Sequence, residues 1–192
     1  MKTAFEIAWE LSDKLYPLNA KEVEALSSVI ESRKVARGQV LLDDGEYAHN
    51  INYVESGLLR QFYFKNGHEI TEHFGCPNDF VFCIESLFKH EATHLMIEAV
   101  ENSEIHSIHY EEMVGLFESM PNIANICRHL LQNALIRSQE KADSWRFESA
   151  RTRYERFIDD FPYAATHAKL NDIASYLLMT PESLSRIRAG VL

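Results

Sequence analysis

Residues 172–188 have the sequence DIASYLLMTPESLSRIR, which contains two short amphipathic segments separated by a break. Thr180 suits a helix N-cap because its hydroxyl can accept a hydrogen bond from a free amide of the first turn, and Pro181 suits the next position, where no amide donor is needed. The apolar residues on one face of the segments are Ile173, Ala174, Leu177, Leu184 and Ile187. This pattern predicts a helix-turn-helix, whose second helix can lie in the major groove of DNA.

The chain as a whole has the composition of a globular protein: 192 residues, 46% of them hydrophobic, can bury a sizeable core. No run of about 18 apolar residues and no basic-then-apolar leader is present, so we expect a cytoplasmic location and no membrane partner. The three cysteines, Cys76, Cys83 and Cys127, form no CxxC pair and are expected to be reduced.

The formal net charge of −10 argues against a protein that coats nucleic acid by general electrostatics. The charge is unevenly distributed, because residues 150–192 carry six basic and five acidic side chains. The acidity therefore belongs to the part of the chain that precedes the helix-turn-helix.

Two helices are expected at the N-terminus. Apolar residues recur at helical spacing from Phe5 to Leu15 and stop at Pro17. Asn19, followed three residues later by Glu22, is a capping-box pattern that marks the start of the second helix.

From Arg33 onward, short apolar runs alternate with turn residues roughly every 8–12 positions, which predicts an antiparallel sandwich or barrel. The strongest hairpin signal is Asn66-Gly67, because a type I′ turn needs positive φ at both central residues. Further strands are expected over residues 95–99 and 104–107, with closure of the barrel near Tyr110.

Helical periodicity returns at Glu111, first for a short helix up to Ser119 and then for a long helix over residues 122–147. The long helix has two neighbouring apolar stripes, which indicate packing on its own barrel and on a partner helix of a dimer, although burial between two domains would give the same pattern. One stripe contains Ile123, Ile126 and Leu130, and the other contains Ala124, Cys127, Leu131, Leu135, Ser138, Ala142 and Trp145.

A further helix is expected over residues 150–161, ending at Pro162. A polar link through His167 then leads into the helix-turn-helix. The residues of this helix that are expected to face inward are Tyr154, Phe157 and Ile158.

The order of these parts resembles the Crp/Fnr family of transcription regulators, with matching blocks over nearly the whole chain. The blocks are residues 37–46 and 53–60, Asp79-Phe80 with Ser86-Leu87-Phe88, and residues 169–188. The resemblance implies an α+β fold: an antiparallel β-roll (a double-stranded β-helix of the cyclic-nucleotide-binding type) with flanking helices over residues 1–120, a dimerisation helix over 121–147 and a winged helix-turn-helix over 148–192. It also implies a homodimer that binds pseudo-palindromic double-stranded DNA, with RNA polymerase as a further partner.

The ligand-binding cassette departs from the family pattern. Members that bind cyclic nucleotides carry a Glu for the ribose hydroxyl and an Arg for the cyclic phosphate. Here Glu85 stands one place out of register, and Thr93-His94 stand near the position of the missing arginine. We therefore expect weak or no cyclic-nucleotide binding and identify no cofactor, and the effector is left open. The positions of this degenerate cassette are Cys83, Ile84, Glu85, Ser86, Thr93 and His94.

The second helix of the motif carries the candidate DNA contacts. Arg186 can donate two hydrogen bonds to guanine, Glu182 can accept one from a cytosine amino group, and Ser185 can bond to bases or phosphates. The alternative is that Glu182 and Arg186, four residues apart, form only a surface ion pair. The expected phosphate contacts are Thr180, Ser183 and Arg188.

Two residues of the motif are unusual for the family. Leu178 stands where the turn usually has Gly, and a left-handed backbone there costs a residue with a Cβ about 1 kcal/mol. Pro181 replaces a basic residue that family members often use for DNA contacts. These departures and the acidity favour an alternative, a ligand-sensing or protein-interaction module whose helix-turn-helix no longer binds DNA.

Nine histidines, together with the likeness of a β-roll to a cupin barrel, raise a second alternative, a metal-dependent cupin-like enzyme with a helical tail. The usual His-x-His with a following Glu is absent, as are a Gly-x-Ser-x-Gly motif and a phosphate-cradling glycine loop. We therefore expect neither a metal site nor enzymatic activity. The metal candidates would be His68-Glu69, Glu72-His73, His90 and His94.

Overall fold

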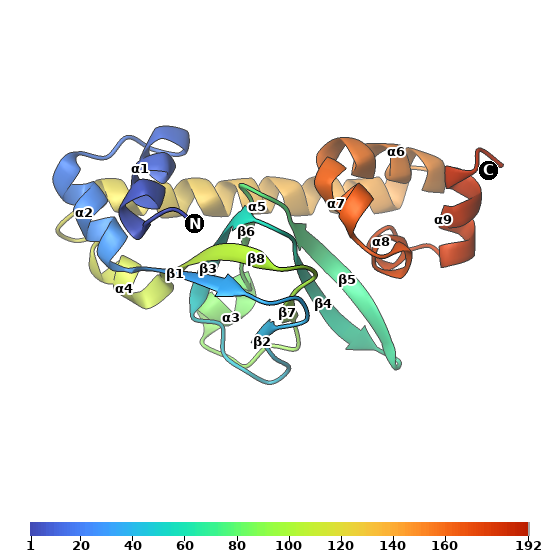
Figure 1. Cartoon of the computed structure of the whole chain (residues 1–192), viewed down its shortest axis with the longest axis horizontal. Coiled ribbons are helices and arrows are strands. Elements are labelled where there is room, and N and C mark those ends of the chain that lie inside the picture. The colour runs from blue at the N-terminus through green and yellow to red at the C-terminus, as the bar shows by residue number, and fades with distance from the viewer. Residues whose placement is uncertain (192) are drawn as a thin grey trace.

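A computed structural model describes residues 1–191. Its longest element is the helix α5 (Pro121–Phe147), with the N-terminal helices at one end and the C-terminal helices at the other (Figure 1). The strands lie on one side of α5, between these two ends (Figure 1). The fold is α+β, as the sequence predicts.

The other helices are α1 (Ala4–Lys14), α2 (Ala20–Ser28), α3 (Ile84–Lys89), α4 (Tyr110–Gly115), α6 (Ala150–Asp160), α7 (Pro162–His167), α8 (Leu170–Tyr176) and α9 (Pro181–Arg188). The strands are β1 (Ile30–Val35), β2 (Val40–Leu42), β3 (Asn50–Ser56), β4 (Leu59–Lys65), β5 (His68–Gly75), β6 (Phe80–Val81), β7 (Met96–Ala99) and β8 (Ser103–His109).

The strands form two antiparallel sheets, in the orders β1-β8-β3-β6 and β2-β7-β4-β5. Apart from β4 and β5, which follow each other directly, neighbours in each sheet are distant in sequence, so the chain winds back and forth between the sheets as in a β-roll. Gly57 is required at one crossing, because its φ is +92° and a Cβ there would lie 2.1 Å from the Ser103 hydroxyl oxygen. The core between the sheets contains Val35, Leu42, Val54, Leu59, Val81, Cys83, Ile97, Ala99 and Ile105.

The predicted hairpin is confirmed as the β4–β5 pair, with φ +53° at Asn66 and +78° at Gly67. The two expected N-terminal helices are also present, and the capping box at Asn19 and Glu22 is formed in both directions. Thr3 and Glu6 make an equivalent capping box at the start of α1.

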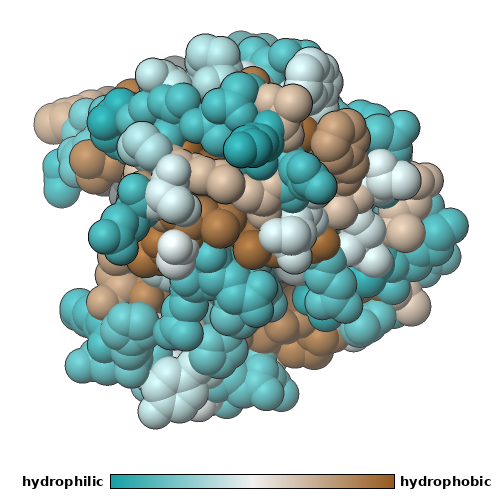
Figure 2. All heavy atoms as spheres, turned by 90° about the vertical axis from the view of Figure 1, so that its left-hand side faces the viewer, coloured by the Kyte–Doolittle hydropathy of each residue, from teal (hydrophilic) through white to brown (hydrophobic). Residues whose placement is uncertain are grey.

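One end of the molecule is formed by α1, α2 and α4. Figure 2 views this end and shows apolar side chains gathered in a band across its middle, with hydrophilic side chains above and below. Large apolar side chains exposed on α1 include Phe5 and Trp9. This face is therefore partly apolar despite the net charge of −10.

Three expectations for the C-terminal region need correction. Pro162 begins a further helix, α7, where a polar link was expected, because its fixed φ and missing amide suit the first turn of a helix. Ile158 is 39% exposed and does not face inward. Residues 148–191 contain no strand, so the wing that the resemblance implies is not found in the described part of the chain.

Candidate nucleic-acid interface and ligand cavity

The helix-turn-helix consists of α8, the turn at residues 177–180, and α9. The Thr180 hydroxyl accepts a hydrogen bond from the Ser183 amide at 3.2 Å, and Pro181 is the first residue of α9, as predicted. Leu178 adopts φ +51°, so the turn is left-handed at this position although the residue is not glycine. Its side chain is 51% exposed and its strain is not offset by burial.

The outer face of α9 presents Glu182, Ser185 and Arg186, all exposed, while Leu184 and Ile187 are buried beneath them. Within residues 1–191 no ion pair joins Glu182 to Arg186, which is the bond the alternative interpretation requires. The backbone amide at the helix start and the Thr180 hydroxyl lower the pKa of Glu182, which keeps this side chain an acceptor.

Arg188 is placed differently from the other candidates. Its Nε donates to the Tyr154 hydroxyl at 3.1 Å, its guanidinium lies 5.6 Å from the Tyr154 ring centroid, and one terminal nitrogen reaches the Ala165 carbonyl at 3.4 Å. Arg188 therefore ties α9 to α6 and α7. Ser183 is half-buried and lies 3.1 Å from the Thr180 hydroxyl oxygen, so it supports the cap.

The C-terminal helices pack directly on the β-roll through α8 and β5. The Ser175 hydroxyl accepts from the Thr71 amide at 3.1 Å and donates to the Thr71 hydroxyl at 3.0 Å. A shared apolar core joins both parts and includes Phe74, Phe157, Phe161 and Tyr176 with ring centroids between 5.4 and 6.4 Å apart. Sequence reasoning missed this interface because the contacts span about a hundred residues of chain.

Arg60 of β4 lies at the centre of the same interface. Its side chain is 3% exposed, and its guanidinium bonds to Asp172 at 2.7 Å, Glu69 at 2.5 Å and Glu98 at 2.7 Å. Asp172 belongs to α8, whereas both glutamates belong to the roll. Burial raises the pKa of Asp172, and the Arg60 charge only partly opposes that effect. The only signal in the sequence was a lone arginine in an apolar strand.

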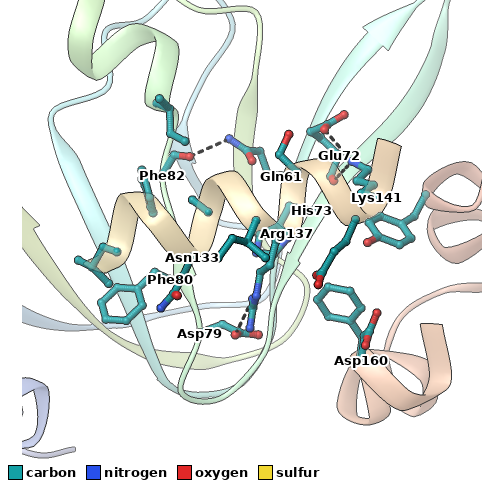
Figure 3. A pocket seen from close by; sticks show the side chains of 18 of the residues that line it. Gln61, Glu72, His73, Asp79, Phe80, Phe82, Asn133, Arg137, Lys141 and Asp160 are labelled. Atoms are coloured by element: carbon teal, nitrogen blue, oxygen red, sulfur yellow. Dashed lines mark hydrogen bonds and ion pairs between the residues drawn. The ribbon is translucent and has the colours of Figure 1, made fainter. Parts of the chain in front are cut away.

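A cavity of about 780 Å³ lies where the roll, α5 and the C-terminal helices meet. Figure 3 shows Gln61, His73 and Phe82 of the roll facing Asn133 and Arg137 of α5, with Asp160 of α6 to one side. Two ion pairs cross the cavity wall, Arg137 to Asp79 at 2.9 Å and Lys141 to Glu72 at 2.6 Å (Figure 3). From the sequence, Glu72 and His73 were named only as metal candidates and Asp79 only as part of a family block. The other cavity residues named here were not predicted as ligand contacts.

The degenerate cassette is only partly at this cavity. Cys83, Ile84 and Glu85 line it, but Glu85 is exposed and pairs with Lys89 at 2.6 Å. The other three residues are engaged elsewhere. Ser86 bonds to the Ala48 amide and the Glu91 carbonyl, the Thr93 hydroxyl accepts from Cys83 Sγ, and His94 is 93% exposed beside Asp44.

The histidines do not converge. Within residues 1–191 no group of three or more His, Cys, Asp or Glu side chains is arranged to hold a metal ion. His90 lies 3.7 Å from Glu111, and His94 lies 2.7 Å from Asp44. Among the same residues no helix is both long and apolar enough to cross a membrane.

The roll, the long helix and the terminal helix-turn-helix together make the fold of Crp/Fnr transcription regulators. FixK2 from Bradyrhizobium japonicum is similar at a TM-score of 0.74 and 16% identity, covering 85% of this chain and 84% of that one. A putative Crp/Fnr regulator from Eubacterium rectale is similar at 0.70 and 18%, covering 96% and 87%. The c-di-GMP-responsive global regulator CLP from Xanthomonas campestris is similar at 0.68 and 18%, covering 90% and 91%. No family model and no curated protein matches the sequence.

Proposed function

We propose that this protein is a homodimeric, sequence-specific DNA-binding regulator of transcription of the Crp/Fnr type. The single observation that carries the proposal is the outer face of α9, where a capped helix at the end of the molecule presents Glu182, Ser185 and Arg186 to solvent. These side chains offer an acceptor, a hydroxyl and a bidentate donor, the groups that read base edges in the major groove.

We propose a separate role for each of three consecutive segments of the chain. Residues 1–120 form an effector-type β-roll, 121–147 the dimerisation helix and 148–192 the DNA-binding part. In a dimer through α5, two copies of α9 about 34 Å apart would read successive half-sites of a pseudo-palindromic operator. Similar structures include a regulator of gene expression and a putative transcriptional regulator, and this resemblance supports DNA and RNA polymerase as partners and a role without enzymatic activity.

Cyclic nucleotides are not expected to be the signal. Glu85, the carboxylate of the degenerate cassette, pairs with Lys89 and is exposed, so it is not in place for a ribose hydroxyl. Calorimetry with cyclic AMP and cyclic GMP should therefore give no heat of binding, and micromolar affinity for either nucleotide would contradict this part of the proposal.

Selection of bound sequences from a random DNA pool with the full chain tests the proposal. We expect enrichment of one pseudo-palindromic motif. Arg186→Ala should lose about 1–3 kcal/mol of discrimination at one base pair per half-site while retaining its affinity for random DNA. Arg128→Ala, an exposed arginine on α5, is the matched control and should leave the motif unchanged.

A second candidate function is a ligand-sensing or protein-interaction module without DNA binding. The net charge of −10 and the use of Arg188 for an intramolecular contact favour it, because both reduce the positive charge available to phosphates. Failure of the random pool to yield any enriched sequence at low salt would support this candidate over the first.

A further inference from the structure

The charged residues that line the cavity are balanced. Five cations and five carboxylates contribute to its wall, and His73 stays uncharged near neutral pH because burial lowers its pKa to about 3. The cations are Lys14, Arg137, Lys141, Arg153 and Arg156, and the carboxylates are Glu72, Asp79, Glu85, Glu140 and Asp160.

Each of these cations already has a partner in the protein. Arg137 pairs with Asp79 and Lys141 with Glu72, as described above, and Lys14 pairs with Glu10 at 2.5 Å. The remaining two are Arg156, which pairs with Glu148, and Arg153, which donates to the carbonyl oxygens of Leu177 and Glu148. A phosphate or carboxylate entering the cavity would therefore have to displace an existing partner to gain a charged contact.

Two neutral amides of the cavity, Gln61 and Asn133, have free hydrogen-bonding capacity. The carboxylates of Glu140 and Asp160, which also have no partner within residues 1–191, are exposed to solvent. Gln61 donates to the Phe82 carbonyl at 3.4 Å, and within residues 1–191 no hydrogen bond uses its side-chain oxygen. Asn133 on α5 makes no side-chain hydrogen bond within the same residues. Both side chains line the cavity, Gln61 from β4 and Asn133 from α5 (Figure 3). They provide donors and acceptors for an uncharged ligand.

The walls around these amides are apolar and aromatic, including Phe80, Phe82, Trp145 and Tyr176. Planar side chains of this kind favour an aromatic or otherwise flat ligand. The cavity also contacts the aromatic core that joins the roll to the C-terminal helices, because the His73 ring lies edge-on to Phe161 at a centroid distance of 5.8 Å.

We propose that the cavity binds an uncharged, partly aromatic small molecule, which contacts the roll, α5 and the C-terminal helices at once. A cavity of about 780 Å³ accommodates a ligand of drug-like size. The regulatory meaning of this site rests on the proposed function, but the binding itself does not.

Two fluorescent probes with the same aromatic skeleton test the proposal. N-phenylnaphthylamine is uncharged, and anilinonaphthalene sulfonate carries a negative charge. We expect the uncharged probe to bind the full chain with one site per chain and about tenfold or more tighter than the sulfonate, because a buried unpaired anion is costly. Equal affinity for the two probes, or tighter binding of the sulfonate, would overturn the proposal.

Variants locate the site and test its charge balance. Ala134→Trp fills the cavity from α5 and should abolish binding of the uncharged probe, whereas Gln132→Trp, on the solvent side of the same helix, should not. Glu72→Gln frees the Lys141 charge and should reduce the preference for the uncharged probe by about tenfold. Unchanged binding in Ala134→Trp, or an unchanged preference in Glu72→Gln, would contradict the site.

The DNA selection is a separate measurement, so the two proposals can fail independently. Probe binding without any enriched DNA sequence would leave the cavity site standing and remove the regulatory role. An enriched sequence without probe binding would do the reverse.

Discussion

Leu178 concentrates backbone strain in the turn of the helix-turn-helix. A residue with a Cβ in the left-handed conformation costs about 1–2 kcal/mol. Glycine removes this strain, but its greater freedom in the unfolded chain cancels part of the gain in stability. We expect Leu178→Gly to raise the free energy of unfolding by about 0.5–1 kcal/mol, measured by urea denaturation. Leu178→Ala keeps the Cβ and is the control, and a gain equal to that of glycine would show that strain is not the cause.

Glu10 on α1 accepts hydrogen bonds from Lys14, Lys2 and the Tyr53 hydroxyl. Burial would raise the pKa of this carboxyl, but the three donors outweigh it and hold the pKa at about 2, below its ordinary 4.5. A depressed pKa contributes stability that is present above the unfolded value and is lost as the pH falls from 4.5 toward 2.

Glu10→Gln should therefore cost stability at neutral pH and lose its effect in acid. After allowance for solvent screening we expect a loss of ~1 kcal/mol at neutral pH. Chemical denaturation at several pH values measures it. Asp13→Asn removes an exposed carboxylate from the same helix and is the control, and a similar profile in both variants would contradict the assignment.

Arg60 and Asp172 pair across the contact between α8 and the roll, but losing one of them has a different consequence from losing the other. Arg60 has two carboxylates within the roll, Glu69 and Glu98, and so keeps partners when Asp172 is neutralised. We expect Asp172→Asn to cost less than about 1 kcal/mol of unfolding free energy, whereas Arg60→Met, which leaves three carboxylates without a cation, should cost about 3–5 kcal/mol. Similar losses in the two variants would contradict this account.

The difference in unfolding free energy between wild type and Asp172→Asn should depend on pH. The raised pKa of Asp172 means that its contribution is present below the unfolded value of 3.8 and is lost as the pH rises through the folded value. Asp172→Asn should therefore become more favourable relative to wild type as the pH rises from about 4 to neutrality. A constant difference between the two proteins over this range would exclude Asp172 as the titrating group.

Elements governed by local chemistry were predictable from the sequence. The Asn66-Gly67 hairpin, the Asn19 capping box and the Thr180 cap each depend on a few neighbouring residues, and all three are present. The helix before Pro162 ends as predicted, but the polar link expected after it was wrong, because a proline is equally suited to end one helix and to begin the next. The Arg60 cluster could not be predicted, since its members come from four strands or helices that only the fold brings together.

In the candidate site, too, features that depend on local sequence were predictable and features that depend on the fold were not. The outward direction of Glu182 and Arg186 follows from helical spacing on α9, but the engagement of Arg188 with Tyr154 depends on how α6 packs. The cavity was beyond sequence reasoning for a related reason. Its polar residues, such as Gln61 and Asn133, lie on separate elements and belong to no motif.

Across the whole molecule, the C-terminal helices and the roll share one apolar core rather than meeting at a loose linker. Leu58, Phe74 and Cys76 of the roll pack in the same cluster as Phe157 and Ile173. Separation of the two parts would expose these side chains to water, which is unfavourable. A ligand that favours a different arrangement of the helix-turn-helix must therefore bind that arrangement tightly enough to offset the loss of these apolar contacts.

Assembly of two copies depends on what α5 leaves exposed after packing on its own chain. The second apolar stripe is partly used within the chain, because Cys127 is 4% exposed and Trp145 lies beneath the Lys141 amine. Leu135 and Ile136 are 61% and 54% exposed and form the surface that we expect a partner helix to cover.

Leu135→Glu should therefore break the proposed dimer. The change removes two leucines from the interface and places two carboxylates near each other across the symmetry axis, so we expect the dimer dissociation constant to rise about a hundredfold or more. Sedimentation velocity at micromolar concentration measures the change. Phe64→Glu, at the tip of the β4–β5 hairpin where Phe64 is 57% exposed, introduces the same charge away from α5 and should leave the dimer intact. A wild-type monomer, or a dimer that persists in Leu135→Glu, would exclude pairing through this face, and with it the spacing of two recognition helices on one operator.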